Sequence, residues 1–201
     1  ALQSLIGSSL NFIDNIMVGK LGELELASVV VGVQIYFVYW MIIFGFTSGC
    51  ATYVSQFFGA EDPKHIKATL GFSTVVCLII GIFFFLISEF FSEQVMRLFT
   101  EDEAMVKLGK IYISVGAPCY LLMAISIPLS MGLRVTRQQK IPMAISIFAL
   151  TCNTILNYML IFGKLGFPKM GAEGAALATV ISRSIEAALI LIMVFKRQKQ
   201  S

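Results

Sequence analysis

The chain has 201 residues, of which 57% are hydrophobic and only 13% are charged; its mean hydropathy is +0.84 and its formal net charge is +3. A soluble domain usually carries about 25% charged residues. An ordinary soluble fold is therefore excluded, because a chain of this length would have to hide more apolar surface than one core can hold.

Long uncharged stretches predict an all-α, polytopic membrane protein, because a spanning helix needs about 20 mostly apolar residues. Neither acidic residues nor Lys or Arg occur in residues 26–60, 68–88, 111–133 and 141–163, and residues 174–195 are interrupted only by Arg183 and Glu186. These stretches are too long and too uniform for barrel strands, which alternate with a period of two. The six predicted helices form one transmembrane unit over residues 1–201 and span residues 1–18, 26–60, 66–91, 104–133, 141–163 and 172–196.

The first predicted helix is short and has no initiator Met, basic leader or cleavage site. We therefore expect it to be the remainder of a longer helix, and the chain to be a fragment.

The charges of the connections predict the topology. The connections on one side, which contain "EDPKHIK", "RVTRQQK" and "KRQKQS", carry eight Lys or Arg and two acidic residues. The connections on the other side carry six Lys or Arg and eight acidic residues. An excess of Lys and Arg marks the cytoplasmic side. Both ends of the chain are thus expected in the cytoplasm of a plasma-membrane protein, and the net charge indicates topology, not nucleic-acid binding.

Glycine and proline residues indicate packing contacts or hinges. Gly45 and Gly49 have the GxxxG spacing that lets two helix backbones approach closely, so they are predicted at a close helix contact. Pro118 and Pro128 each remove a backbone donor and are predicted to kink the fourth helix. A further small-residue face runs from Gly171 through Gly174 and Ala175 to Ala178.

Polar residues at depth form the candidate site. Asp14 shares a helix face with Asn11, Asn153 shares one with Asn157 at a spacing of four, and Thr179 lies about two turns into the last helix. An Asp at a helix centre costs roughly 2.5–3.5 kcal/mol to insert, which favours a proton or cation site. The alternative is a set of interhelical hydrogen bonds that only holds the bundle together.

Other residues have simpler interpretations. Arg183 and Glu186 are spaced for a structural ion pair. The four cysteines lie in apolar spans without a CxxC spacing, and no catalytic motif is present. We therefore expect no enzyme, no cofactor and no metal beyond a possible Na⁺ at Asp14. Aromatic residues near Trp40 can line a cavity, although lipid contact or core packing would also explain them. The candidate cavity residues are Asn11, Gln34, Tyr36 and Tyr39.

Three stretches resemble the multidrug and toxic compound extrusion (MATE) transporters: "DNIMVGKLGELELASVVVG", "GFTSGCATYVSQFFGAED" and "NTILNYMLIFGKLGFPKMGAEGAALATVISR". The resemblance extends over nearly the whole chain, with the three stretches in the order they have in the family. The resemblance implies a twelve-helix protein of two lobes, of which this chain is the N-terminal lobe and the C-terminal lobe is a missing partner. It also places a cation or proton site on Asp14, Asn153, Asn157 and Thr179. Asp14 is the only carboxylate of that set, and the residues do not choose between Na⁺ and a proton.

The resemblance implies a cation-coupled antiporter that exports amphipathic, often cationic, organic compounds. A flippase for a lipid-linked sugar would need several cations in its spans, where the sequence offers Arg183. An intramembrane enzyme would need a second buried Asp or a Ser-His set, and a purely structural subunit would leave the cost of Asp14 unexplained.

Overall fold

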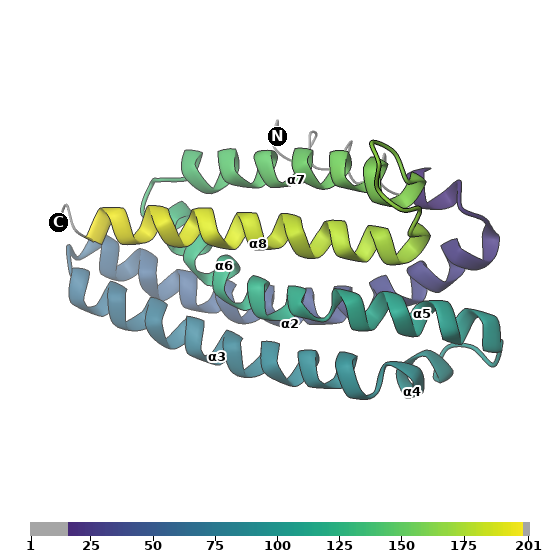
Figure 1. Ribbon diagram of the computed structural model, residues 1–201. Helices are drawn as coiled ribbons and strands as arrows, with labels where there is room; N and C mark the ends of the chain where they lie inside the picture. The colour runs from purple at the N-terminus through teal and green to yellow at the C-terminus, as the bar shows by residue number, and fades with distance from the viewer. Residues whose placement is uncertain (1–15, 199–201) are drawn as a thin grey trace.

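The computed structural model describes residues 16–198, and every regular element in that range is an α-helix (Figure 1). Residues 16–19 are helical and precede α2, and the following elements are α2 (Glu23–Gly59), α3 (Pro63–Phe90), α4 (Ser92–Arg97), α5 (Glu103–Gly116), α6 (Pro118–Val135), α7 (Lys140–Phe162) and α8 (Gly171–Gln198). The all-α class is confirmed. Most of the first predicted helix lies outside the described residues.

The predicted fourth helix, residues 104–133, is two helices in the structure. α5 ends at Gly116 and α6 begins at Pro118. Pro118 has no N–H to donate to the Ser114 carbonyl, which instead accepts the N–H of Ala117 at 3.2 Å. Pro128, by contrast, lies inside α6, fully buried, and the helix continues through it. The short helix α4 was not predicted, because its six residues lie in a charged stretch that carries no spanning signal.

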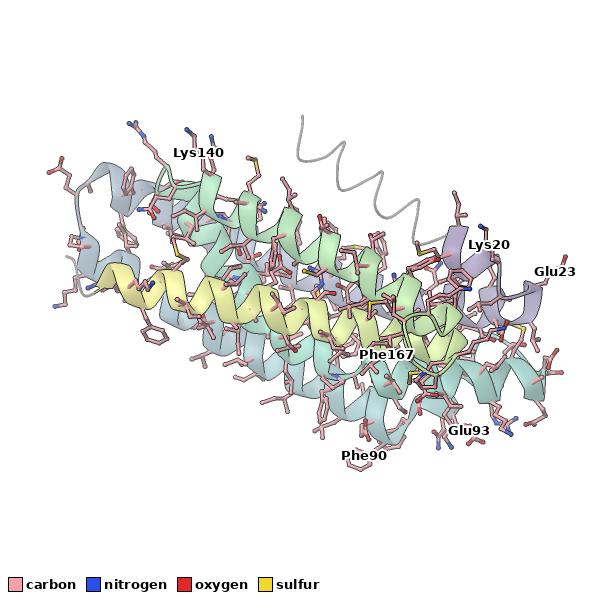
Figure 2. All side chains as sticks on the ribbon, turned by 45° about the horizontal axis from the view of Figure 1, so that its top comes forward. Lys20, Glu23, Phe90, Glu93, Lys140 and Phe167 are labelled. Atoms are coloured by element: carbon pink, nitrogen blue, oxygen red, sulfur yellow. The ribbon has the colours of Figure 1, made fainter. Side chains whose placement is uncertain are left out.

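Five helices of the described range are long and apolar enough to cross a membrane: α2, α3, α6, α7 and α8. Large apolar side chains point outward from them, as Phe90 does from α3 (Figure 2). Charged residues gather at the ends of the bundle, with Lys20, Glu23 and Glu93 at one end and Lys140 at the other (Figure 2). An apolar belt between two charged ends is the surface that a bilayer requires. The chain is therefore a multi-pass membrane protein.

Helix α8 is the central element of the bundle. It packs against α7 on one side and against α5 and α6 on the other, while α2 packs against α3, α5 and α6. A buried cluster joins α2, α3 and α6, and its members are Tyr39, Ile43, Cys77, Tyr120, Met123 and Ala124. This arrangement leaves the polar faces of α7 and α8 opposite each other.

Small residues allow one very close helix contact, between α7 and α8. A Cβ atom added at Gly174 would lie 2.8 Å from the carbonyl carbon of Leu160. Ala175 and Ala178 of the same face are also buried. The predicted contact at Gly45 and Gly49 is wrong for the described chain, because a Cβ added at either would meet nothing within 4 Å. Both glycines instead line an apolar groove with residues of α2 and α3 that include Phe46 and Phe72.

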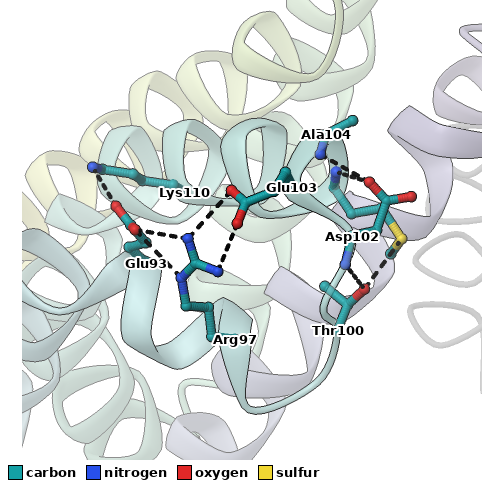
Figure 3. Close-up of polar contacts among 8 residues, drawn as sticks. Glu93, Arg97, Thr100, Asp102, Glu103, Ala104 and Lys110 are labelled. Atoms are coloured by element: carbon teal, nitrogen blue, oxygen red, sulfur yellow. Dashed lines mark hydrogen bonds and ion pairs between the residues drawn. The ribbon is translucent and has the colours of Figure 1, made fainter.

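Charged side chains hold α4 against α5 at one end of the bundle (Figure 3). Arg97 donates to Glu103 at 2.9 Å and to Glu93 at 3.2 Å, and Lys110 donates to Glu93 at 3.0 Å. Asp102 caps the N-terminus of α5 by accepting the N–H of Ala104 at 2.8 Å. This network fixes the segment that joins α3 to α5, which lies at the charged end of the bundle, outside the apolar belt.

Candidate functional site

Asn153 and Asn157 of α7 meet Thr179 of α8 inside the bundle. The Nδ2 of Asn153 donates to the Thr179 hydroxyl at 3.4 Å, and the Nδ2 of Asn157 donates to the Oδ1 of Asn153 at 3.3 Å. The two amides lie one turn apart on the buried face of α7, and only small residues on the facing part of α8 let the helices approach this closely. Three of the four residues predicted for the cation site thus lie together.

One oxygen of this cluster has no hydrogen-bond partner among residues 16–198. The Oδ1 of Asn157 is buried and accepts no hydrogen bond from the described residues. Leaving such a group unsatisfied costs about 1–3 kcal/mol, which needs an explanation in a native structure. Amide and hydroxyl oxygens are ligands for a hard cation such as Na⁺, so the donor set fits a coupling ion. Asp14 and Asn11 lie outside the described residues.

Arg183 and Glu186 form the predicted ion pair, 2.6 Å apart, on the same helix as Thr179. Glu186 also accepts the hydroxyl of Ser146 from α7 at 2.8 Å. The pair lies beside the amide cluster, because one pocket of about 590 Å³ is lined by Asn153 and Thr179 as well as by Arg183 and Glu186.

A second pocket, of about 490 Å³, adjoins the first. The two pockets share four lining residues: Tyr36, Ser146, Arg183 and Glu186. The second pocket has an aromatic side from α2, formed by Tyr36, Phe37, Trp40 and Phe44, and a polar side that includes Ser126, Ser130 and Arg134 of α6.

The four predicted cavity residues have different positions. Tyr36 lines both pockets. Tyr39 does not line them: it is fully buried in the core, where its hydroxyl donates to the Tyr120 carbonyl at 2.6 Å. Tyr39 is therefore a structural residue, since the helix turns it toward α6. Gln34 is exposed on α2, and Asn11 is outside the described range.

Sequence reasoning missed the polar side of the second pocket. Arg134 lies at the end of α6, where the sequence places it in the charged connection that follows, and Arg183 is then the single cation predicted within the spans. Ser146 and Ser126 carry no local signal, because serine is common in membrane helices and only its neighbours on other helices give it a role.

The chain matches the MatE family model over residues 1–159. It is 26% identical to "Probable multidrug resistance protein NorM" of Thermotoga maritima, over 98% of this chain and 42% of that protein, and 27% identical to "Probable multidrug resistance protein YoeA" of Bacillus subtilis, over 85% of this chain and 37% of that protein. The chain thus spans less than half the length of these curated relatives.

Solved structures have the same fold. An outward-facing multidrug resistance MATE transporter aligns with a TM-score of 0.88 and 20% identity over 98% of this chain and 43% of its own. A transporter of the MOP superfamily from Pyrococcus furiosus aligns with a TM-score of 0.87 and 21% identity, over 96% and 42%. With the family model matching most of its length, the chain belongs to the MatE family of membrane transporters.

Proposed function

We propose that the chain forms the N-terminal half of a cation-coupled antiporter that exports amphipathic or cationic organic compounds. The observation that carries this proposal is the cluster of the buried amides of Asn153 and Asn157 with the half-buried Thr179 hydroxyl, within otherwise apolar helices. The multidrug resistance relatives support export, and their greater length supports a second lobe. The protein would lie in the plasma membrane with both ends of the chain in the cytoplasm.

Asp14 supplies the charge in this mechanism. A proton or Na⁺ neutralises the Asp14 carboxylate, and the amide and hydroxyl oxygens complete the coordination of Na⁺. An ion can shift the lobe between two shapes only if it binds one shape more tightly than the other. Binding therefore has to be linked to a change in how α7 and α8 pack around the cluster.

The test is efflux from vesicles that contain the two-lobed protein to which this lobe belongs. A fluorescent amphipathic compound is loaded, and an Na⁺ gradient or a pH gradient is imposed separately. We expect one gradient to drive efflux and Asp14→Asn to abolish the driven component while leaving substrate binding. Full gradient-driven efflux by Asp14→Asn, corrected for the amount of inserted protein, would show that the acid is structural.

Two other functions give different results in the same assay. A lipid-linked sugar flippase would move a lipid between leaflets and leave the amphipathic dye inside. A non-transporting structural subunit would move neither.

A further inference from the structure

The pocket of about 490 Å³ between α2, α6, α7 and α8 contains groups that the coupling site does not use. Its size is that of a site for a small organic molecule. Its two sides differ in chemistry, with aromatic rings on α2 and charged or hydroxyl side chains on α6, α7 and α8.

The charge that a ligand can reach in this pocket is positive. Glu186 is 9% exposed, and its two carboxylate oxygens already accept from Ser146 and Arg183. The Arg183 side chain is 32% exposed, and its Nη1 makes the bond to Glu186. A guanidinium has five N–H donors, so donors remain for a ligand. Arg134 is exposed and adds a second guanidinium.

A further polar group lies against Arg183. The Tyr36 hydroxyl is buried and interacts with the Arg183 guanidinium, but it makes no well-aligned hydrogen bond to a described residue. Because a guanidinium has no acceptor, an oxyanion bound to Arg183 would accept the Tyr36 O–H and remove the cost of leaving that donor unsatisfied.

The opposite side is a stack of aromatic rings. Trp40 and Phe44 lie nearly parallel with centroids 5.0 Å apart, and Phe37 lies 6.2 Å from Trp40. All three side chains are exposed. They offer flat apolar surface to an aromatic ligand.

We propose that this pocket binds amphipathic aromatic compounds through an anionic group, a carboxylate or similar oxyanion, held by Arg183 and Arg134. This inference rests on the proposed export function, because it takes the ligand to be the exported substrate. It restricts that substrate to compounds that carry an anionic group, with or without an amine elsewhere in the molecule. Glu186 is a positioning residue: it holds Arg183 in place and competes with the ligand for its donors.

Trp40 provides the readout, because it is the only tryptophan of the chain and lies on the pocket wall. Bromine quenches indole fluorescence on contact. The purified 201-residue chain in lipid nanodiscs is titrated with para-bromophenylacetate, its uncharged amide and the cation para-bromophenethylammonium. We expect the quenching to saturate, with the affinity highest for the carboxylate, lower for the amide and lowest for the amine. The carboxylate should bind at least about tenfold more tightly than the amide, as for a charge-assisted hydrogen bond.

Variants separate the role of the charges from folding. Arg134→Gln should reduce carboxylate affinity and leave amide affinity unchanged. The double variant R183Q/E186Q removes both members of the ion pair and so leaves no unpaired buried charge. It should also reduce carboxylate affinity and leave amide affinity unchanged. Glu186→Gln alone should tighten carboxylate binding, because it frees Arg183 and removes a like charge; a merely structural ion pair would give loss or no change. Lys140→Gln, which removes an exposed cation outside the pocket, is the control.

Equal quenching by the carboxylate and the amide, tighter binding of the amine, or the same loss in Lys140→Gln would overturn the proposal. The assay needs no ion gradient. Arginine-dependent carboxylate binding without gradient-driven efflux would therefore refute the export function and support this site. Gradient-driven efflux without a preference for the carboxylate would refute this site and support the export function.

Discussion

Asn157 is the residue whose environment most needs an explanation. It donates from Nδ2 to Asn153, while its buried Oδ1 accepts nothing within the described range. A purely structural amide would gain by pairing both ends. An amide oxygen without a hydrogen-bond donor, close to a threonine hydroxyl, fits the ion site proposed above, because both oxygens are ligands that a hard cation accepts.

Replacing Asn157 by Ala should therefore affect ion coupling more than stability. The variant loses one 3.3 Å hydrogen bond but also removes an unsatisfied oxygen, so the melting temperature should change little. In the two-lobed protein we expect gradient-driven efflux to need a higher ion concentration, with a smaller loss than Asp14→Asn causes. Thr151→Ala is the control, because Thr151 is exposed on the same helix and its hydroxyl donates to the Ile147 carbonyl of that helix at 2.9 Å. Unchanged ion dependence in Asn157→Ala would remove Asn157 from the site.

Glu93 gives a pH-dependent prediction at the end of the bundle. The Lys110 ammonium, and next the Arg97 guanidinium, hold the pKa of the Glu93 carboxyl below its ordinary value of 4.5. Because the pKa is lowered in the folded state, the stabilisation is fully present above pH 4.5 and is lost as the pH falls through the folded-state value. The effect is small, since the carboxylate is exposed.

The measurement is the melting temperature of the parent chain minus that of Glu93→Gln, followed from neutral pH downward. The difference should be constant at first and should vanish in acid. Glu89→Gln, an exposed acid outside the network, controls for net charge. A difference that grows on acidification would contradict this assignment.

At the scale of helices, the contact between α7 and α8 determines the geometry of the candidate site. Gly174 lets the Leu160 backbone approach to a distance that any side chain would prevent. This contact sets the separation of the two helices that carry the amides and Thr179, so packing here supports the site.

Gly174→Leu should destabilise the chain by overpacking, by about 1–3 kcal/mol or more, because the atom in the way belongs to the backbone and cannot rotate aside. Gly49→Leu is the matched control: it adds the same side chain in a spanning helix where nothing lies within 4 Å. Thermal melts in detergent compare the two variants. Equal melting temperatures would show that the close contact does not hold the helices together.

At the scale of the whole molecule, the chain forms one helical bundle and spans 42% of the length of its relative from Thermotoga maritima. Each spanning helix satisfies its own backbone hydrogen bonds, so the bundle can insert by itself. Alternating access requires a second body against which this one moves.

We therefore expect the 201-residue chain alone to insert into vesicles but not to carry out coupled transport. Co-expression with the remaining half should restore gradient-driven efflux of the dye. Coupled transport by the chain alone would refute the two-lobe mechanism.

The sequence by itself determined the helical class, the positions of the long helices and the candidate amides, because hydrophobic length and helical spacing are local properties. Asn153 and Asn157, four residues apart, lie on one face of any helix. Thr179 could be predicted because it lies about two turns into the next helix.

Only the tertiary structure decided which faces meet. Gly45 and Gly174 carry similar small-residue signals, yet one faces open space and the other a backbone. Pro118 separates two helices, whereas Pro128 is accommodated within α6, which packs on α2 and α3. Arg134 and Ser146 join Arg183 in one pocket from three helices. A local pattern gives the direction of a side chain within its own helix, but helix rotation and separation follow from packing against all neighbours at once.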